Sequence, residues 1–392
     1  MKPRLLAIVP DPDGAFAQAG GVLSATRAVL GPEVHAVFDV DIVDTTMRAF
    51  PRPDLRERVT SGAGRGAAVL RSIAHRRPQV AIAFCSEGTS FYEKSALLLL
   101  ARAAGARTWL SPRSGRAEAW LERSARARRW VTHVGHKLDG LLVQSEGWRE
   151  VYARAGVPRE RLHIWHNTVD TRIWQPIASA RRPAPPERPF RFLFLGWAIE
   201  AKGLRELCAA VETLEARSGP QFQLAIAGDG ALGETLREQA AEGRLPRSIE
   251  LLGWVKGDRR ADELARADAL VLPTHVDGFP NVVLEAMACA LPVIATPVGA
   301  IPDVVLPEET GLLIPTRDVG SLVEAMDRLR HHPEEAAAMG QRGLARARAR
   351  FDRTVGVARL LELLLGEQDR EGAPGMNTMT LGEEPRSQGA GE

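Results

Sequence analysis

Short apolar runs alternate with amphipathic stretches along almost the whole chain. Twelve runs are typical of strands, namely residues 4–10, 34–43, 79–86, 107–112, 139–146, 162–167, 190–197, 222–230, 248–255, 268–274, 291–298 and 311–315. Stretches with helical periodicity, such as 89–105 and 118–138, lie between them. Uninterrupted apolar strands separated by helices are typical of parallel sheets that are covered on both faces. The pattern predicts an α/β fold with two doubly wound, Rossmann-like domains, followed by C-terminal helices.

A proline-rich, basic stretch, QPIASARRPAPPERPF at 175–190, divides the two sets of strands. It has no hydrophobic period, which favours an extended and fairly stiff linker. The last 26 residues have few apolar side chains to bury, which is typical of disorder. We therefore expect an N-terminal domain over 1–175, a linker over 176–189, a C-terminal domain over 190–351, a C-terminal helix over 352–366 that packs back on the first domain, and a disordered tail over 367–392.

The composition is that of an ordinary globular protein, with 45% hydrophobic and 26% charged residues among 392. No apolar run approaches the roughly 18 residues of a membrane span, and the first run is too short for a signal peptide. The three cysteines occur singly, which argues against a disulfide framework or a cysteine metal site. We therefore expect a cytoplasmic protein.

The charge differs between the two halves of the chain. Residues 1–180 carry 26 Lys and Arg against 17 Asp and Glu, a balance of +9, and the remainder carries 25 against 32, a balance of −7. Residues 113–137 are especially basic, with seven Lys and Arg against two glutamates. Such a surface attracts membrane lipid, nucleic acid or a phosphorylated substrate, although a solvated helix in an arginine-rich chain is the more ordinary explanation.

The segment GDGALG at 228–233 has the spelling of a dinucleotide-binding fingerprint. A true fingerprint opens the first strand-to-helix turn of its domain, whereas this one follows the second strand of the second half. The acid at a suitable distance, Glu250, begins its strand instead of ending it, and Asp229 puts a negative charge inside the loop. We interpret the segment as a tight turn of the scaffold, with a nicotinamide-dependent enzyme as the weaker alternative.

The stretch 272–305 combines two carboxylates with a helix start. A loop over 277–280 follows a strand, and a helix begins near Asn281, which is a good N-cap residue. The first N–H groups of such a helix favour an anion, while Asp277 and Glu285 can accept hydrogen bonds from the hydroxyls of a diol. Lys202, at another strand-to-helix junction, can neutralise a diphosphate. Taken alone, Asp277 is better explained as a loop cap and Glu285 as a solvated helix residue.

The same block carries a resemblance to a known family. DGFPNVVLEAMACALPVIATPVGAIPDVV, followed by TGLLIPTRD, resembles the retaining nucleotide-sugar glycosyltransferases of glycosyltransferase family 4 in residue spacing, in the LEAMA helix and in the downstream TGLL. The similarity extends over roughly residues 1–365 in the order of elements. It implies the GT-B fold, in which two Rossmann-like domains face each other across a cleft.

The resemblance also implies roles for individual residues. Lys202 contacts the diphosphate and Asp277 lies near the donor sugar, so these two are the expected catalytic residues, while Glu285 holds the ribose hydroxyls. The expected donor-binding residues are Gly20, Gly21, Gly196, Trp197, Lys202, Gly278, Phe279, Pro280, Asn281, Val282 and Glu285. The turn in IWHNTVD at 164–170 is similar to the turn that precedes the interdomain linker in this family.

Three departures from the family pattern stand out. Trp197 occupies a position where the family often has an arginine, and one lost cation weakens leaving-group stabilisation by roughly a few kcal/mol unless another replaces it. Asp277 is one methylene shorter than the usual glutamate. The first-domain loop LSPRSGR lacks the histidine of many members, and Arg113 or Ser114 is expected on the acceptor or donor-sugar side instead.

We therefore expect a retaining transfer of a sugar from a nucleoside diphosphate sugar to a hydroxyl acceptor. The second domain holds the donor, the first holds the acceptor, and the cleft closes between them. No metal or cofactor is expected, because DVD at 39–41 is interpreted as part of a strand. Lipid-linked acceptors of relatives suggest peripheral contact with an anionic membrane, whereas nucleic acid is not an expected partner. A non-catalytic nucleotide-sugar-binding protein is the alternative.

Overall fold

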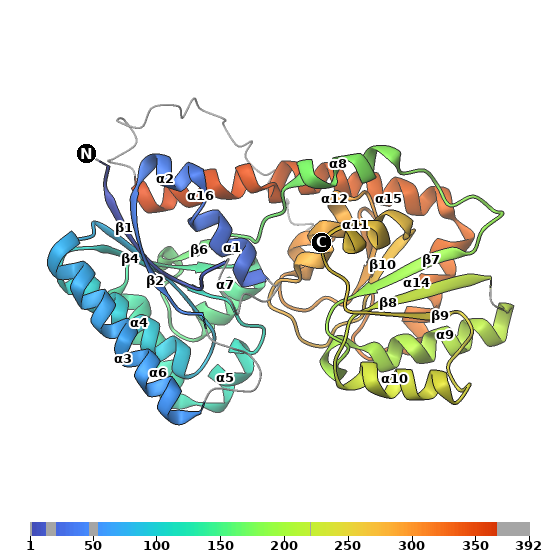
Figure 1. Cartoon of the computed structure of the whole chain (residues 1–392), viewed down its shortest axis with the longest axis horizontal. Coiled ribbons are helices and arrows are strands. Elements are labelled where there is room, and N and C mark those ends of the chain that lie inside the picture. The colour runs from blue at the N-terminus through green and yellow to red at the C-terminus, as the bar shows by residue number, and fades with distance from the viewer. Residues whose placement is uncertain (1, 13–20, 47–53, 220, 367–392) are drawn as a thin grey trace, which may run out of the picture.

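The computed structural model describes residues 2–12, 21–46, 54–219 and 221–366. In these residues the chain forms two six-stranded parallel sheets that lie next to each other (Figure 1). The first sheet has the order β2-β1-β3-β4-β5-β6. Its strands are β1 (Arg4–Val9), β2 (Asp39–Asp44), β3 (Val80–Cys85), β4 (Arg107–Pro112), β5 (Gly140–Val143) and β6 (Leu162–Ile164).

Alternating side chains of the first sheet enter two separate hydrophobic clusters. In β1, Leu6 and Ile8 lie on one face, whereas Leu5 and Val9 lie on the other. The helices that contribute to the first cluster are α3 (Leu55–Arg71), α4 (Thr89–Ala103), α5 (Ala117–Arg123), α6 (Ala125–Lys137) and α7 (Glu146–Arg154). The second cluster is covered by α1 (Gly21–Val29), α2 (Pro32–Val37) and α16 (Arg353–Leu365). The sheet is thus buried on both faces, which explains its continuous apolar strands.

Helix α16 follows the second sheet in sequence but packs on the first, beside α1 and α2 (Figure 1). Its Leu360 and Leu364 are fully buried in the cluster of β1 and β3. The indole Nε1 of Trp165 donates to the Gly356 carbonyl at 3.0 Å, and Arg107 donates to the Leu365 carbonyl at 2.7 Å. The end of the described chain is therefore part of the core of the first half.

The second sheet has the order β12-β11-β10-β7-β8-β9. Its strands are β7 (Phe190–Leu195), β8 (Phe222–Ala227), β9 (Ile249–Gly253), β10 (Ala269–Leu272), β11 (Val293–Ala295) and β12 (Gly311–Leu313). Its helices are α9 (Leu204–Ser218), α10 (Ala231–Ala241), α11 (Gly257–Arg266), α12 (Asn281–Ala288), α13 (Ile301–Val304), α14 (Val319–His331) and α15 (Pro333–Arg346). One large hydrophobic cluster joins the strands to these helices.

The segment between the sheets is tied to the second sheet. Helix α8 (Thr171–Ala180) contains Pro176, so the first five residues of the expected linker are helical. Arg181 donates to the carbonyls of Leu264 and Cys289 at 2.7 and 3.0 Å. Arg188 forms two hydrogen bonds with the buried carboxylate of Asp268, at 2.5 and 2.6 Å. The non-helical stretch 181–189 is therefore held at both ends.

Each sheet has a point at which the strand order reverses. In the first sheet it lies between β1 and β3, and in the second between β7 and β10. In open α/β sheets, ligands bind beyond the carboxyl ends of the strands at this switch point. The fold thus provides two candidate crevices, one in each half.

The predicted fold class is confirmed, with two corrections to local structure. The apolar run 34–43 is not one strand, because Pro32–Val37 forms α2 and the strand begins at Asp39. The predicted helix 118–138 is two helices, since Ser124 is extended and its side chain accepts from Ala127 N at 3.1 Å as the cap of α6. DVD lies inside β2, as expected. The predicted tail 367–392 lies outside the described residues.

Candidate active site

Two loops meet at the switch point of the second sheet. After β7 a short 3₁₀ turn, Glu200–Lys202, ends at Gly203, whose φ is 67°. A Cβ at Gly203 would lie 1.9 Å from the Pro273 carbonyl oxygen, so this turn packs on the loop that follows β10. His275 N and Thr274 Oγ1 both donate to the Ala201 carbonyl, at 2.9 and 3.0 Å. This close packing requires glycine at position 203 and holds the loop after β7 against the loop after β10.

Lys202 and Asp277 form an ion pair across these loops. Their side chains are 19% and 13% exposed, so both charges are largely removed from water. Sequence reasoning placed the two residues at junctions of the same sheet, and the structure brings them into contact. An ammonium that already has a carboxylate partner is held at the place where a donor diphosphate is expected.

Glu285 lies in the second turn of α12 and pairs with Arg260 of α11. Burial raises the pKa of Glu285 to about 7, and the nearby guanidinium of Arg260 opposes that rise. Arg260 was not predicted from the sequence, because its helix, GDRRADELAR, contains three arginines and no pattern distinguishes one from the others. The pair supplies a second, partly buried cation and carboxylate in this half of the molecule.

Asn281 is not the N-cap of α12, contrary to expectation. Pro280 occupies the cap position, and Asn281 is the first helical residue. The Oδ1 of Asn281 accepts a hydrogen bond of 2.7 Å from Nδ2 of Asn167, which comes from the first half of the chain. The side chain is thus engaged by a distant residue instead of by its own helix. The backbone N–H groups of the α12 start remain next to the loop 277–280.

The first half of the chain rests directly on the loop 277–280. The indole Nε1 of Trp148 donates to the Gly278 carbonyl at 3.0 Å. Gly115 is so close that a Cβ there would lie 2.6 Å from the carbonyl carbon of Asp277. Glu146 N also donates to Asp303 Oδ2 at 2.7 Å. The two halves therefore meet at the loop in which the donor site is expected.

Asn167 joins these contacts into a network. Its Oδ1 accepts from Arg113 Nη1 at 2.6 Å and from Gln144 Nε2 at 3.0 Å, while its Nδ2 donates to Asn281. Sequence reasoning noticed the motif IWHNTVD but assigned no role to Asn167. The similarity of that motif to the family turn was the one signal that could have identified it.

Arg113 is buried at the carboxyl end of β4, whereas the Ser114 side chain is engaged by a neighbouring glutamate. The Arg113 guanidinium lies 4.6 Å from the ring centre of Phe84 and 4.5 Å from that of Trp165. Burial lowers the pKa of Arg113 to about 9. The Ser114 hydroxyl donates to the Glu87 carboxylate. Both residues thus lie on the first-half side of the interface. Arg113 belongs to the hydrogen-bond network around Asn167 and Asn281, which we call the donor-loop network.

Trp197 is 45% exposed and packs against Trp254, with ring centres 4.7 Å apart. These two rings follow β7 and β9, so they form an aromatic pair at the carboxyl edge of the second sheet. Gly20 lies outside the described residues, and Gly21 is the first residue of α1. The expected contact of this glycine pair with the donor therefore stays a prediction.

The glycines of GDGALG serve the scaffold. A Cβ at Gly228 would lie 1.8 Å from the Gly196 carbonyl oxygen, and one at Gly230 would lie 2.7 Å from that of Ala198. Ala198 N donates to the Asp229 carbonyl and Leu232 N to the Ala198 carbonyl, both at 2.9 Å. The space that a pyrophosphate would need is filled by the loop after β7. The interpretation as a tight turn is confirmed.

The comparisons with known proteins agree with this arrangement. The family described as Glycosyl transferases group 1 matches residues 178–346. The chain is also 30% identical over 282 residues to a GDP-mannose-dependent alpha-(1-6)-phosphatidylinositol monomannoside mannosyltransferase of Mycolicibacterium smegmatis, covering 69% of this chain and 73% of the relative. The chain belongs to the glycosyl transferases group 1 family. It is a retaining glycosyltransferase that takes its sugar from a nucleotide sugar, which removes the support for a nicotinamide enzyme or a non-catalytic binder.

This glycosyltransferase is also similar to other proteins, one in sequence and two in fold. It is 28% identical over 236 residues to a glycogen synthase of Mycobacterium tuberculosis, covering 60% of this chain and 53% of the relative. The fold matches sucrose-phosphate synthase from Thermosynechococcus elongatus with a TM-score of 0.73 at 21% identity, over 93% of this chain and 98% of that chain. It matches Anabaena HepE in complex with UDP with a TM-score of 0.66 at 18% identity, over 93% and 99%. These matches show the GT-B fold.

Two kinds of feature are absent from the described residues of this glycosyltransferase. Outside the gaps at 13–20, 47–53 and 220 and the two ends, no group of three or more His, Cys, Asp and Glu side chains could hold a metal ion. In the same part of the chain, no helix is long and apolar enough to cross a membrane.

Proposed function

We propose that the switch point of the second sheet is the donor site and that the acceptor binds in the first half of the chain. The observation that supports this most directly is the Lys202–Asp277 ion pair at the carboxyl edge of the sheet, next to the start of α12. The site offers a cation and helix N–H groups for a diphosphate and carboxylates for sugar hydroxyls. A nucleoside diphosphate sugar carries both kinds of group.

Lys202 acts on the leaving group in this proposal. Transfer with retention passes through a transition state in which positive charge grows on the sugar and negative charge grows on the departing diphosphate. A largely buried ammonium stabilises that negative charge more strongly than one in water. The diphosphate replaces Asp277 as the partner of Lys202, and Asp277 is then free to accept a hydrogen bond from the donor sugar. No step of this scheme needs a metal ion.

Glu285 holds the ribose, and Arg260 favours the charged form of Glu285. A carboxylate accepts hydrogen bonds from two vicinal hydroxyls, whereas a protonated carboxyl group accepts them less well. Because burial raises the pKa of Glu285 to about 7, the opposing charge of Arg260 matters for donor binding near neutral pH. The exposed ring of Trp197 and the half-buried ring of Trp254 add an aromatic surface on which the nucleobase can stack.

The acceptor is a hydroxyl compound, and a lipid-linked glycan is the favoured class. The mannosyltransferase of Mycolicibacterium smegmatis is named for a phosphatidylinositol monomannoside. In this chain, α5 and α6 present a basic surface of exposed side chains, formed by Arg116, Arg123, Arg126, Arg128, Arg129 and Lys137. Such a surface suits peripheral contact with anionic lipid on the cytoplasmic side of a membrane.

Co-sedimentation with vesicles tests the membrane contact. We expect the protein to sediment with vesicles that contain phosphatidylglycerol and to be released by salt, since these charges are exposed and therefore screened. Neutral phosphatidylcholine vesicles are the control. Equal behaviour with both kinds of vesicle at low salt would remove the membrane from the proposal.

Calorimetric titration with UDP, GDP, ADP and NAD tests the donor site. We expect one nucleoside diphosphate to bind saturably and its affinity to fall by roughly tenfold in Glu285→Gln, which corresponds to the loss of one charged hydrogen bond. The matched control is Glu238→Gln, which changes an exposed glutamate of α10 and should leave the affinity unchanged. Equal affinity in the wild type and in both variants would show that the nucleotide binds elsewhere.

A further inference from the structure

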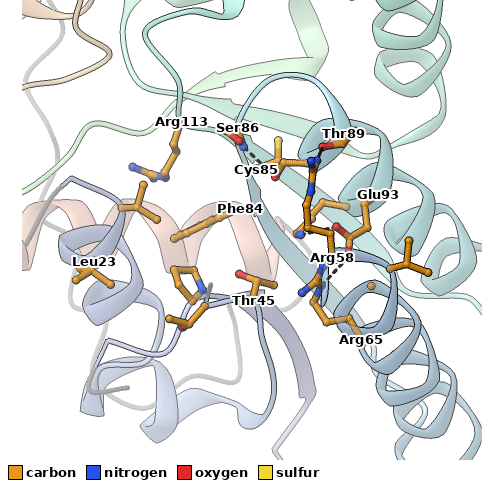
Figure 2. A pocket seen from close by; sticks show the side chains of 17 residues that line it. Leu23, Thr45, Arg58, Arg65, Phe84, Cys85, Ser86, Thr89, Glu93 and Arg113 are labelled. Carbon is orange, nitrogen blue, oxygen red and sulfur yellow. Dashed lines mark hydrogen bonds and ion pairs between the residues drawn. The ribbon is translucent and has the colours of Figure 1, made fainter. Parts of the chain in front are cut away.

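A cavity of about 790 Å³ opens at the switch point of the first sheet, where β1 and β3 end. Its lining comes from the ends of several strands and from the helices α1, α3 and α4. Figure 2 shows Arg113 and Phe84 on one side of the cavity and Arg58, Arg65 and Glu93 on the other. Small-molecule sites have volumes of about 300 to 1,000 Å³, so this cavity can hold a ligand of sugar size.

The lining carries an excess of positive charge. Among the described residues that line the cavity, Arg58, Arg65, Lys94 and Arg113 are cations and Glu93 is the one carboxylate. Glu93 is shared between Arg65 Nε at 2.6 Å and Lys94 Nζ at 2.8 Å. Although burial alone would raise the pKa of Glu93, the hydrogen bonds from these two cations lower it. Glu93 therefore stays ionised and offsets a single charge, which leaves a balance of +3.

Two of the cations have no carboxylate partner within the described part of the chain. Arg58 of α3 is exposed and donates to the Thr89 hydroxyl at 3.1 Å. Arg113 is nine-tenths buried, and its Nε and Nη2 have no hydrogen-bond partner among the described residues. The neighbouring carboxylate of Glu87 is engaged by the Ser114 hydroxyl. A buried guanidinium with unused donors is costly unless an anion supplies acceptors.

We propose that the acceptor of this glycosyltransferase carries a phosphate group, and that Arg58, Lys94 and Arg113 bind that phosphate in the first-sheet cavity. The inference rests on the proposed function, in which the acceptor binds in the first half. A phosphate monoester carries a charge of roughly −1.5 to −2 near neutral pH, which suits an excess of three cations better than a neutral sugar does. Arginine guanidinium groups can also hold phosphate oxygens through two parallel hydrogen bonds.

Arg113 places this phosphate site on the donor-loop network. Its Nη1 donates to Asn167, whose Nδ2 donates to Asn281 at the start of α12. A phosphate bound to the unused donors of Arg113 is therefore connected, through Arg113, to Asn167, which makes the contact with Asn281 of the second half. A hydroxyl elsewhere on the same acceptor can then face the donor sugar. The phosphate belongs either to a soluble sugar phosphate, which is a monoester, or to a phospholipid headgroup, which is a diester with a single negative charge. Both present anionic phosphate oxygens to the same cations.

Binding of two defined probes tests the proposal. Glycerol 3-phosphate, with neutral glycerol as its control, represents a soluble phosphate ester. Phosphatidylcholine vesicles with and without phosphatidylinositol represent a lipid headgroup. Both probes are titrated with the donor site filled by the nucleoside diphosphate that binds the wild type, so that the donor site cannot accept the phosphate. The variants are Arg58→Gln and Arg56→Gln, of which the second changes an exposed arginine of the same helix that does not line the cavity.

We expect a phosphate probe to bind the wild type and Arg56→Gln equally, and to bind Arg58→Gln roughly tenfold more weakly, as the loss of one charged contact predicts. That pattern with glycerol 3-phosphate supports a soluble acceptor, and the same pattern with phosphatidylinositol vesicles alone supports a lipid acceptor. Binding of neither probe, or equal weakening in both variants, overturns the proposal. Nucleotide binding measured on the same samples reports on the donor site separately, so a failure of the phosphate site can be distinguished from a failure of the donor site.

Discussion

The two sheets present the same feature, a switch point at the carboxyl edge, but their charges are arranged differently. At the second sheet, each cation of the described site faces a carboxylate, in the pairs Lys202–Asp277 and Arg260–Glu285. At the first sheet, four cations of the described lining face the single carboxylate of Glu93. The balanced crevice belongs to the proposed donor site, and the cationic crevice belongs to the proposed acceptor site.

The difference shows that the helices and loops around each sheet, and not the sheet itself, determine what each crevice accepts. A donor that enters the second crevice meets charges that already have partners, so binding must exchange one ion pair for another. An anion that enters the first crevice meets unused donors on Arg113 and disturbs no described ion pair of that residue. Asn167 links the two crevices, because it forms hydrogen bonds with Arg113 of the first half and Asn281 of the second.

Removal of Lys202 is expected to have the largest effect on transfer, because it removes one of the two cations of the donor crevice and leaves Asp277 unpaired. Lys202→Met should lower kcat by roughly 10²- to 10³-fold, the range for loss of one group that stabilises developing negative charge. KM for the donor should change much less. Steady-state kinetics with the nucleotide sugar that the titration identifies measures both constants.

The matched control for this variant is Lys256→Met, which changes an exposed lysine of the same half. Thermal unfolding of both variants separates a loss of folding from a loss of chemistry, since Lys202→Met leaves Asp277 without its partner. An unchanged kcat in folded Lys202→Met would contradict the role of Lys202 on the leaving group.

Glu285 should produce the next largest effect, and its pH dependence sharpens the account of the donor crevice. The pKa of Glu285 is about 7 in the folded protein, above the ordinary glutamate value of 4.5 that applies to the unfolded chain. The folded state therefore binds the proton more tightly, so this group's contribution to stability is present below pH 4.5 and is lost as pH rises through about 7. Donor affinity should change in the opposite direction, rising as the carboxyl group ionises.

Glu285→Gln should remove both pH dependences and weaken donor binding by roughly tenfold above pH 7. Urea unfolding and calorimetry between pH 5 and pH 8, within roughly one or two units of that pKa, measure the two trends. Parallel pH profiles for wild type and variant would mean that Glu285 does not titrate in this range.

The contact between the two crevices should show a smaller effect. Asn167→Ala removes the bridge from Arg113 to Asn281, and we expect transfer to fall by about fivefold, in line with roughly 1 kcal/mol for one hydrogen bond. Asn281→Ala should cost a similar amount, and the double variant should cost little more than either single variant. Strict additivity in this double-mutant cycle would show that the two amides act independently.

The fold was predictable because its signals are local. Parallel strands that are buried on both faces are continuous apolar runs, and each of the twelve runs overlaps a strand of the described sheets. The error at 34–43 arose because VHAV fits a helix as well as a strand. The cap residue Gly31 and the first helical residue Pro32 were the stronger signal. The break at Ser124 was missed because a continuous helical pattern concealed the capping residue.

The candidate site was predictable only where a motif carried it. Lys202, Asp277 and Glu285 were selected because their spacing follows the family pattern, and each of them takes part in an ion pair. Their roles in donor binding stay predictions. The role of Asn281 was misjudged because its partner, Asn167, is 114 residues away in the sequence. The cationic cavity was not predicted either, since its charges come from α3, α4 and the end of β4, which only the fold brings together.

The affinity of Asp277→Asn for the nucleoside diphosphate tests the central claim most directly. If the donor crevice is balanced by an internal ion pair, the diphosphate competes with Asp277 for Lys202. Loss of the Asp277 charge should then raise nucleoside diphosphate affinity several-fold while transfer to the acceptor falls. An affinity that drops in Asp277→Asn, as it should in Glu285→Gln, would contradict the exchange of ion pairs on which the account depends.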